Sequence, residues 1–440
     1  MQSYFHDLVG ELEKLLTGDE RYLASFAGED SDFVRFNKGE IRQAGTVSQR
    51  YLEVDLIEGK RHASSEITLA GDLATDLPRL RQTVAELRET RPFLPDDPHL
   101  LYAEDAPSSE RVQRGELPAG ADAANAVQAM GAGHDLVGVY AAGPIYSGFA
   151  SSLGQRNWHS AESFHLDWSL YREADRAVKS SYAGFAWSPD ELDKKARHAE
   201  AQLAALARPA RTLKPGRYRV FLTPAALGEL VEILSWSGFS LRALRTKTTP
   251  LIRLAEDNAR LHPSVEVAEN VGGGVAPNFQ EEGFIRPDRV PLIERGQLAG
   301  CLVSPRSAAE YGVATNGASE HETPTSIELG AGDLPSDDVL TRLGSGLFVS
   351  NLWYCNFSDR TACRATGMTR FATFWVENGA LAAPVNVMRF DETIYRVLGD
   401  NLVGLTAERE LILDAQTYDG RSVHSAHLPG ALVDDFTLTL

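Results

Sequence analysis

In Leu222-Thr-Pro-Ala-Ala-Leu-Gly-Glu-Leu-Val-Glu-Ile-Leu234, the sequence predicts the start and the body of an amphipathic helix. Thr223 can cap this helix by accepting a hydrogen bond from a free backbone N–H, and Pro224 suits the first helical position. Apolar residues recur at helical spacing along one stripe, at Leu227, Leu230, Val231 and Leu234. The residues off the stripe are predicted to face a groove, and they are Gly228, Glu229, Glu232 and Ser235. This helix contains no histidine.

The elements around this helix predict a separate C-terminal domain over residues 215–440. A strand over 217–222 leads into the helix, and the chain beyond residue 248 is rich in Gly, Pro, Asn and short β-like runs. Within it, Glu377-Asn-Gly-Ala380 predicts a tight hairpin, because Asn and Gly accept the positive φ of a two-residue loop. We therefore expect this domain to be mostly antiparallel β.

The preceding part of the chain predicts two mixed domains, over residues 1–100 and 101–214. In the first we expect a helix over 3–16, antiparallel hairpins and a helix over 70–90. An acidic stretch with four prolines, residues 91–110, predicts the linker that follows.

The middle domain is expected to begin with a helix over 120–131 and to contain a strand-like stretch over 163–186. A capping box, Ser188-Pro-Asp-Glu191, then predicts a helix to about residue 206. The fold class that follows from all three domains is α+β.

Length and composition indicate an ordinary globular protein. At 440 residues the chain is too long for one typical core, and its hydrophobic fraction of 43% and charged fraction of 24% are unremarkable. No apolar run approaches the roughly 20 residues that span a bilayer, and the first residues lack the pattern of a secretory signal. We therefore expect a cytoplasmic protein with no membrane partner.

Charge and cysteine content exclude further classes. The 61 acidic and 43 basic side chains leave a net charge of −18, which repels phosphate backbones, so nucleic acid is not an expected partner. The three cysteines, Cys301, Cys355 and Cys363, cannot all pair with one another, and we expect reduced thiols.

Several segments together resemble the TldD/PmbA family, whose members have been described as modulators of DNA gyrase and as peptidase components. The resemblance spans nearly the whole chain, and its carriers are the strands over 33–41 and 56–64, the helix after Leu222, and the stretches 344–349 and 374–385. The resemblance implies a three-part fold, assembly into dimers and a cavity between subunits in which peptides are handled.

The catalytic branch of that family carries His-Glu-x-x-x-His on the third-domain helix and a cysteine near the C-terminus. These three ligands leave a fourth zinc position for water. When this chain is aligned with the motif, Gly228 and Ile233 replace the histidines and Tyr418 replaces the cysteine. Neither Gly nor Ile has a lone pair to offer, so we expect no zinc and no other cofactor. Glu229 alone falls on the general-base position, as a vestige with no metal-bound water to deprotonate.

By this analogy the chain resembles the PmbA (TldE) branch, whose members are zinc-less. The resemblance implies a non-catalytic subunit that pairs with a TldD-type zinc metallopeptidase, or with a second copy of itself, to bind and process unfolded peptides. The polar loop over 314–321 is expected to contact the peptide through Asn316, Gly317 and His321, on loop chemistry and family analogy.

Two alternatives come from other classes. One is a self-sufficient peptidase or hydrolase with a relocated site that uses His321, Glu322 or Cys355. The other is a homodimeric peptide-binding scaffold with no catalytic partner. A cluster of strand residues, Trp158, His159, His165 and Trp168, is expected to serve cross-strand packing rather than binding.

Overall fold

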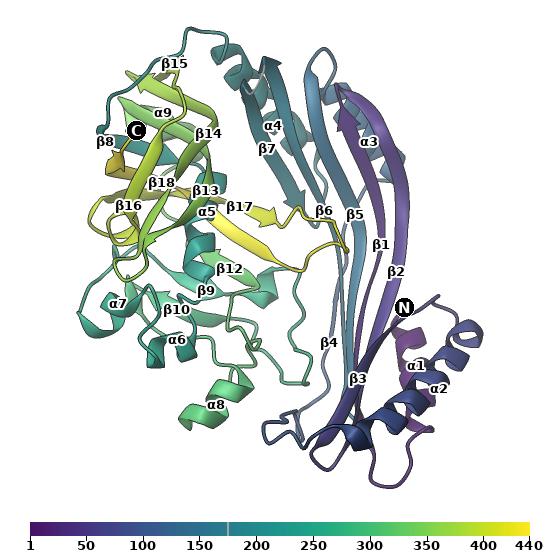
Figure 1. Cartoon of the computed structure of the whole chain (residues 1–440). Helices are drawn as coiled ribbons and strands as arrows, with labels where there is room; N and C mark the ends of the chain where they lie inside the picture. Colours follow the sequence, from purple (N-terminus) through teal and green to yellow (C-terminus); the bar gives the residue numbers. More distant parts are fainter. Residues whose placement is uncertain (174–175) are drawn as a thin grey trace.

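The computed structural model describes residues 1–173 and 176–440. Two large sheets dominate it, one of seven strands from the first half of the chain and one of eleven strands from the second half. In Figure 1 the long strands of the first sheet stand on the right and the second sheet on the left. The predicted α+β class is confirmed.

The N-terminal sheet has the strand order β3-β2-β1-β5-β6-β4, with β7 beside β6. All its neighbouring strands are antiparallel except β4 and β6, which are parallel. The strand bounds are β1 (Arg21–Asn37), β2 (Glu40–Glu58), β3 (Arg61–Thr68), β4 (Glu110–Gln113), β5 (Asp135–Ser151), β6 (Arg156–Glu173) and β7 (Arg176–Gly184).

The structure corrects the expected separation of residues 1–100 from residues 101–214. Strand β1 from the first range pairs along its length with β5 from the second, so both ranges build one sheet. Pairing between distant strands leaves no mark in local periodicity, so the sequence indicates a boundary at the Pro-rich stretch where the structure has none. The stretch 163–186 is likewise two paired strands, β6 and β7, and the residues between them lie outside the described part.

Four helices accompany this sheet, close to where the sequence predicts them. They are α1 (Gln2–Glu13), α2 (Leu73–Thr90), α3 (Gly120–Met130) and α4 (Pro189–Ala205). The α4 helix begins as predicted, with the Ser188 side chain accepting a hydrogen bond from the Glu191 N–H. The Pro-rich stretch contains a short 3₁₀ turn, η1 (Arg91–Phe93), before β4, and it connects two parts of one sheet rather than two domains.

The C-terminal sheet has the order β11-β10-β9-β12-β18-β16-β14-β13-β8, with β15 beside β14 and β17 beside β18. Most pairs are antiparallel, and the parallel ones are β12 with β18 and β13 with β8. The strand bounds are β8 (Gly216–Leu222), β9 (Val267–Glu269), β10 (Val290–Glu294), β11 (Gln297–Leu298), β12 (Ser326–Leu329), β13 (Gly346–Asp359), β14 (Arg364–Glu377), β15 (Ala380–Pro384), β16 (Arg389–Thr393), β17 (Leu402–Leu413) and β18 (Ser425–Leu438).

Short helices and turns complete this half. They are α5 (Pro224–Ser235), α6 (Leu241–Arg245), α7 (Ile252–Glu256), α8 (Pro305–Tyr311), α9 (Val339–Leu343), η2 (Val271–Gly273), η3 (Ser336–Asp338) and η4 (Arg396–Asp400). The predicted hairpin joins β14 to β15, and its turn residues Asn378 and Gly379 have φ values of 50° and 76°.

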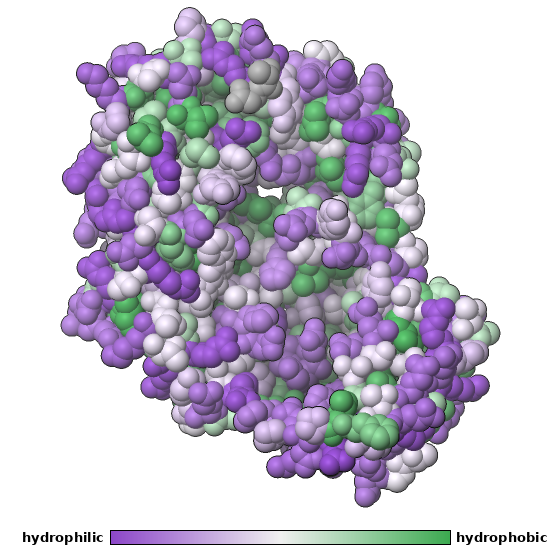
Figure 2. Space-filling model, in the orientation of Figure 1, coloured by the Kyte–Doolittle hydropathy of each residue, from purple (hydrophilic) through white to green (hydrophobic). Residues whose placement is uncertain are grey.

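The two halves of the chain contact each other near both ends of the molecule. At one end, Ala372 and Phe374 of β14 join the hydrophobic cluster of the N-terminal sheet. At the other, the Gln155 side chain donates to the Gly283 carbonyl at 2.8 Å. Between these ends the space-filling view shows a hollow, with a small opening through the molecule (Figure 2).

Among the residues that the structure describes, no helix combines the length and the apolar character needed to cross a membrane.

Candidate functional site

Helix α5 is positioned by its cap and by its buried stripe. The Thr223 hydroxyl accepts from the Ala226 N–H at 3.2 Å and donates to the Ser350 carbonyl at 2.6 Å, which ties the helix start to β13. The predicted apolar stripe is buried as expected. The expected groove-side position of Ser235 is wrong: Ser235 is buried beside Val231 where strands pack against α5, and its hydroxyl donates to the Val231 carbonyl at 3.1 Å.

The three positions aligned with zinc ligands do not converge. A Cβ at Gly228 would lie 3.3 Å from Leu428 Cδ1 and 3.8 Å from Ile412 Cδ1, so this position faces apolar side chains. Ile233 is 1% exposed in the core, about 140° around the helix from Gly228. Tyr418 is 99% exposed, on the loop between β17 and β18.

These residues therefore do not fit zinc. Neither Gly nor Ile can donate an electron pair, and the phenol of Tyr418 points into solvent. Within residues 1–173 and 176–440, no group of three or more His, Cys, Asp or Glu side chains is arranged to hold a metal ion.

Glu229 lies on the exposed side of α5 and faces charges from both halves of the molecule. Loss of hydration raises the pKa of its carboxyl group, the Lys179 ammonium of β7 opposes this shift, and Glu232 adds to it. The Lys179 Nζ lies 3.3 Å from Asp167 Oδ2 of β6. The helix thus presents a carboxylate toward the polar face of the N-terminal sheet, where no described histidine or cysteine joins it in a metal-binding group.

The residues of the relocated-site alternative are not brought together. Glu322 is fully buried and accepts hydrogen bonds from the Ser304 N–H at 2.9 Å and the Arg242 N–H at 2.9 Å. Burial alone would raise the pKa of Glu322, but these bonds and one from Ser240 lower it, so the carboxylate is occupied in holding α6 and α8. His321 is 74% exposed beside it in sequence.

The thiols are equally unsuited to nucleophilic chemistry. Burial raises the pKa of Cys355 to about 12, with Glu229 adding to the shift. Burial also raises the pKa of Cys363 to about 12. Because the thiolate is the nucleophile, neither sulfur is activated near neutral pH.

The polar groups of the predicted peptide-contacting loop are largely hydrogen-bonded to neighbouring parts of the same chain. Asn316 accepts from the Val303 N–H at 2.8 Å and donates to the Cys301 carbonyl at 2.8 Å. Gly317 has a φ of 68°, and its carbonyl accepts from Arg286 at 3.1 Å. His321 is the one of the three predicted residues whose side chain lies mostly in solvent.

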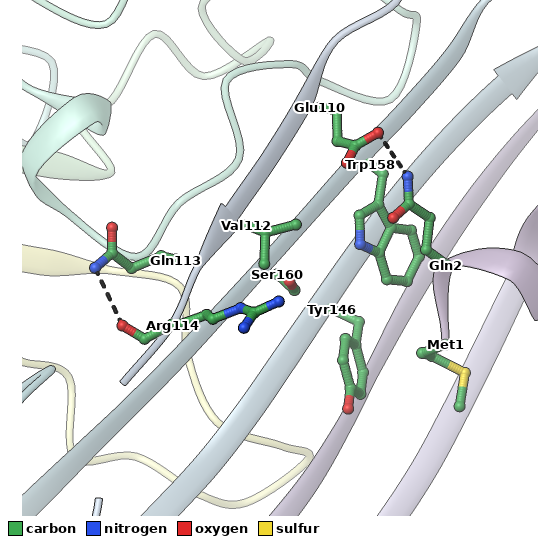
Figure 3. A pocket seen from close by; sticks show the side chains of 9 residues that line it. All are labelled: Met1, Gln2, Glu110, Val112, Gln113, Arg114, Tyr146, Trp158 and Ser160. Carbon is green, nitrogen blue, oxygen red and sulfur yellow. Dashed lines mark hydrogen bonds between the residues drawn. The ribbon is translucent and has the colours of Figure 1, made fainter. Parts of the chain in front are cut away.

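A groove of about 680 Å³ lies on the other face of the N-terminal sheet (Figure 3). Trp158 and Ser160 point into it, whereas the alternate residue His159 points the opposite way and contacts the Val275 carbonyl at 3.0 Å. The groove floor is the stacked pair of Tyr146 and Trp158, and Arg114 reaches over it. The groove therefore lies on the opposite face of the N-terminal sheet from the one that Glu229 faces.

The polar side chains on the face of β6 turned toward the C-terminal half are functional candidates that the motifs of the sequence do not indicate as a set. His159, Ser163, His165 and Asp167 alternate with Trp158, Phe164, Leu166 and Trp168. The aromatic and aliphatic set packs in cores, as expected for Trp158 and Trp168. The alternation with a period of two indicates that the polar set shares one face of the strand, and in the structure this face is turned toward the C-terminal half.

Comparison with known proteins finds one matching family model. Residues 215–440 match the family model of the PmbA/TldA metallopeptidase C-terminal domain. No curated protein matches the sequence.

Solved structures match over almost the whole chain. TldE from Thermococcus kodakarensis aligns with a TM-score of 0.79 at 13% identity, covering 99% of this chain and 100% of that chain. A proposed modulator of DNA gyrase from Thermotoga maritima aligns with a TM-score of 0.72 at 15% identity, covering 99% of each. A similarly described protein from Bacteroides thetaiotaomicron aligns with a TM-score of 0.71 at 14% identity, covering 99% of this chain and 98% of that chain. At these identities the likeness shows the fold.

Proposed function

Since the chain belongs to the PmbA/TldD metallopeptidase family, whose C-terminal domain model matches more than half of it, we propose that it is a zinc-less, TldE-like subunit. In this proposal it pairs with a TldD-type zinc metallopeptidase and helps to enclose unfolded peptides for cleavage. Its own contribution is to bind the peptide and shape the cavity.

One observation carries the proposal. The positions that align with the zinc ligands are Gly228, Ile233 and Tyr418, which lie respectively against apolar side chains, in the core and in solvent. Without a metal-bound water, Glu229 has no acidified water proton to take, so this chain lacks the means to activate water at α5. The chain is left with binding and assembly as its part in proteolysis.

A peptide can be held without sequence preference by strand addition to a sheet edge, which suits a processing protease. The N-terminal sheet ends in β3 on one side and, on the other, in β4 and β7, which both pair with β6, so these are the edge strands of the described sheet. We propose this mode of binding for unfolded segments.

The decisive test measures zinc and peptide cleavage together. The purified chain should contain far less than one zinc per molecule by elemental analysis and should not cleave an unfolded protein such as β-casein. Co-expression with a TldD-type subunit should yield a complex that cleaves it. Cleavage by the chain alone would contradict the proposal, and a chelator would then separate a metal route from a thiol route. A chain that binds casein but stays inactive with every TldD-type subunit would instead be the homodimeric scaffold.

We expect Glu229→Gln to leave the peptidase rate of such a complex within about twofold of the unsubstituted rate, because the lost group has no metal-bound water to deprotonate. Glu232→Gln is the matched control, since it neutralises a second exposed carboxylate on the same helix. A fall of about a hundredfold or more for Glu229→Gln alone would identify Glu229 as a working acid–base residue.

A further inference from the structure

A loop from the C-terminal half crosses the hollow and binds the N-terminal sheet. We call this segment, residues 414–424 between β17 and β18, the cover loop. In Figure 1 it runs from the end of β17 to β5 and β6 and returns to β18. Its two ends rest on one hydrophobic cluster, in which Leu413 and Val423 meet Ile145 and Ala161.

Arg421 holds the middle of the cover loop against two strands. Its guanidinium donates to the Gly143 carbonyl of β5 at 2.7 Å, and to the carbonyl and hydroxyl of Ser163 of β6 at 3.0 and 2.6 Å. Loss of hydration lowers the pKa of Arg421 to about 10, and Glu29 opposes this shift. Among the residues described, no carboxylate lies within ion-pair distance of Arg421. The loop is thus fastened by hydrogen bonds to neutral oxygens.

A second anchor lies two strands away. The Gln49 side chain of β2 donates to the Asp419 carbonyl at 2.7 Å and to Glu29 Oε1 of β1 at 2.6 Å. The loop backbone is close here, because a Cβ at Gly420 would lie 3.0 Å from Gln49 Nε2. The cover loop therefore spans β2, β1, β5 and β6.

The surface beneath the cover loop is polar, and part of it has no partner within the protein. Glu29 is 3% exposed and His165 is 4% exposed. Glu29 Oε2, His165 Nε2 and Arg421 Nε are inaccessible to solvent, and none has a hydrogen-bond partner in the described residues. Buried polar atoms are nearly always paired, so a cluster of unpaired ones indicates a surface suited to a polar contact that the loop itself does not make.

We propose that the cover loop is a displaceable lid over a polypeptide-binding face of the N-terminal sheet, and that Arg421 is the residue that keeps it closed. This inference rests on the proposed function for the class of ligand. Backbone N–H and C=O groups of an extended chain would supply the donors and acceptors that Glu29 and His165 lack. Because the loop and the ligand compete for one face, the fraction of open loop limits the apparent affinity.

The first measurement is cleavage by trypsin after residue 421, followed by mass spectrometry on the full chain. Arg421→Lys keeps a trypsin site, but an ammonium is a single nitrogen and cannot reproduce the two-nitrogen contact that the guanidinium makes with β5 and β6. Gln49→Ala releases the second anchor and leaves Arg421 itself in place. We expect about tenfold faster cleavage in each variant, because Arg421→Lys weakens charge-assisted hydrogen bonds to the sheet and Gln49→Ala removes a neutral one to the loop backbone. Tyr418→Ser is the matched control on the same loop, because Tyr418 is 99% exposed.

The second measurement is the affinity of the chain alone for fluorescently labelled β-casein, by anisotropy. Arg421→Lys and Gln49→Ala should bind about tenfold more tightly than the native chain, and Tyr418→Ser should bind equally. Unchanged trypsin cleavage in both anchor variants would show that these contacts do not hold the loop. Equally fast cleavage in Tyr418→Ser would also contradict the proposal, because the loop would then open without loss of an anchor. Faster cleavage with unchanged casein affinity would show that the surface beneath the cover loop does not bind polypeptide. None of these results depends on a TldD-type partner, so failure here is distinct from failure of partner-dependent cleavage.

Discussion

The stability advantage of the native chain over His159→Gln and over His165→Gln should shrink by about 2 kcal/mol each between pH 7 and pH 5. Burial lowers the pKa of His159 to about 4, with Arg111 also lowering it and the hydrogen bond to the Val275 carbonyl opposing. Burial lowers the pKa of His165 to about 4, with Arg421 also lowering it and Asp414 opposing. Both imidazoles are at most 4% exposed.

The direction follows from proton binding. Between pH 6.5 and about pH 4 the unfolded chain binds a proton at each imidazole, whereas the folded chain does not. The unfolded state is therefore stabilised as the pH falls through this window, and above pH 6.5 neither state is charged, so there is no effect. Glutamine cannot titrate, and in His159→Gln its amide nitrogen can replace the Nε2 donor to Val275.

The measurement is chemical denaturation of each variant at several pH values, with the difference from the native chain plotted against pH. His321→Gln is the control, because that imidazole is 74% exposed and stays in water in both states. Taking differences removes the contribution of carboxyl groups such as Asp167, whose pKa is raised by burial. A pH-independent difference for both buried histidines would mean that water reaches them in the folded protein, contrary to their burial.

Gly238→Ala should lower the free energy of unfolding by about 3 kcal/mol, because the new methyl group has no space. Gly238 follows α5, and its N–H donates to the Leu234 carbonyl at 2.8 Å. A Cβ at this position would collide with that same carbonyl oxygen, which belongs to the backbone and cannot rotate away. The turn that ends α5 would have to open, which would disturb Phe239 in the core below.

Gly10→Ala is the matched control and should change stability in the opposite direction. Gly10 lies inside α1, where a Cβ would meet nothing within 4 Å. Alanine should therefore stabilise the chain by about 0.5–1 kcal/mol through helix propensity. Guanidinium titration of both variants checks the pair, and a Gly238→Ala protein as stable as the native chain would show that the turn after α5 is not closely packed.

Local signals predicted much of the fold. The cap at Thr223, the apolar stripe of α5, the Ser188 cap of α4 and the turn at Asn378 and Gly379 all form as expected, although the Ser188 N–H donates to the Tyr182 hydroxyl rather than to Glu191 as a full capping box requires. Each depends on residues within a few positions of one another, which is the range over which propensity and periodicity act.

Sheet membership and the fate of single polar residues could not be predicted in this way. The pairing of β1 with β5 places Leu23 opposite Ser151, and no local feature of either segment indicates which strand it pairs with. Ser235 lies one turn after Val231 at the edge of the apolar stripe, and its burial depends on the strands that pack against α5. The burial of His159 and His165 likewise depends on the C-terminal half covering their face of β6.

The sequence by itself determined that α5 offers no zinc-binding pair, because a residue without a lone pair cannot become a ligand in any conformation, and Gly228 and Ile233 are such residues. Only the tertiary structure decided where Arg421 lies. Its acceptors, Gly143 and Ser163, are 278 and 258 positions away in the chain, and a contact over that separation exists only once both sheets have formed and the hollow between them has a fixed width.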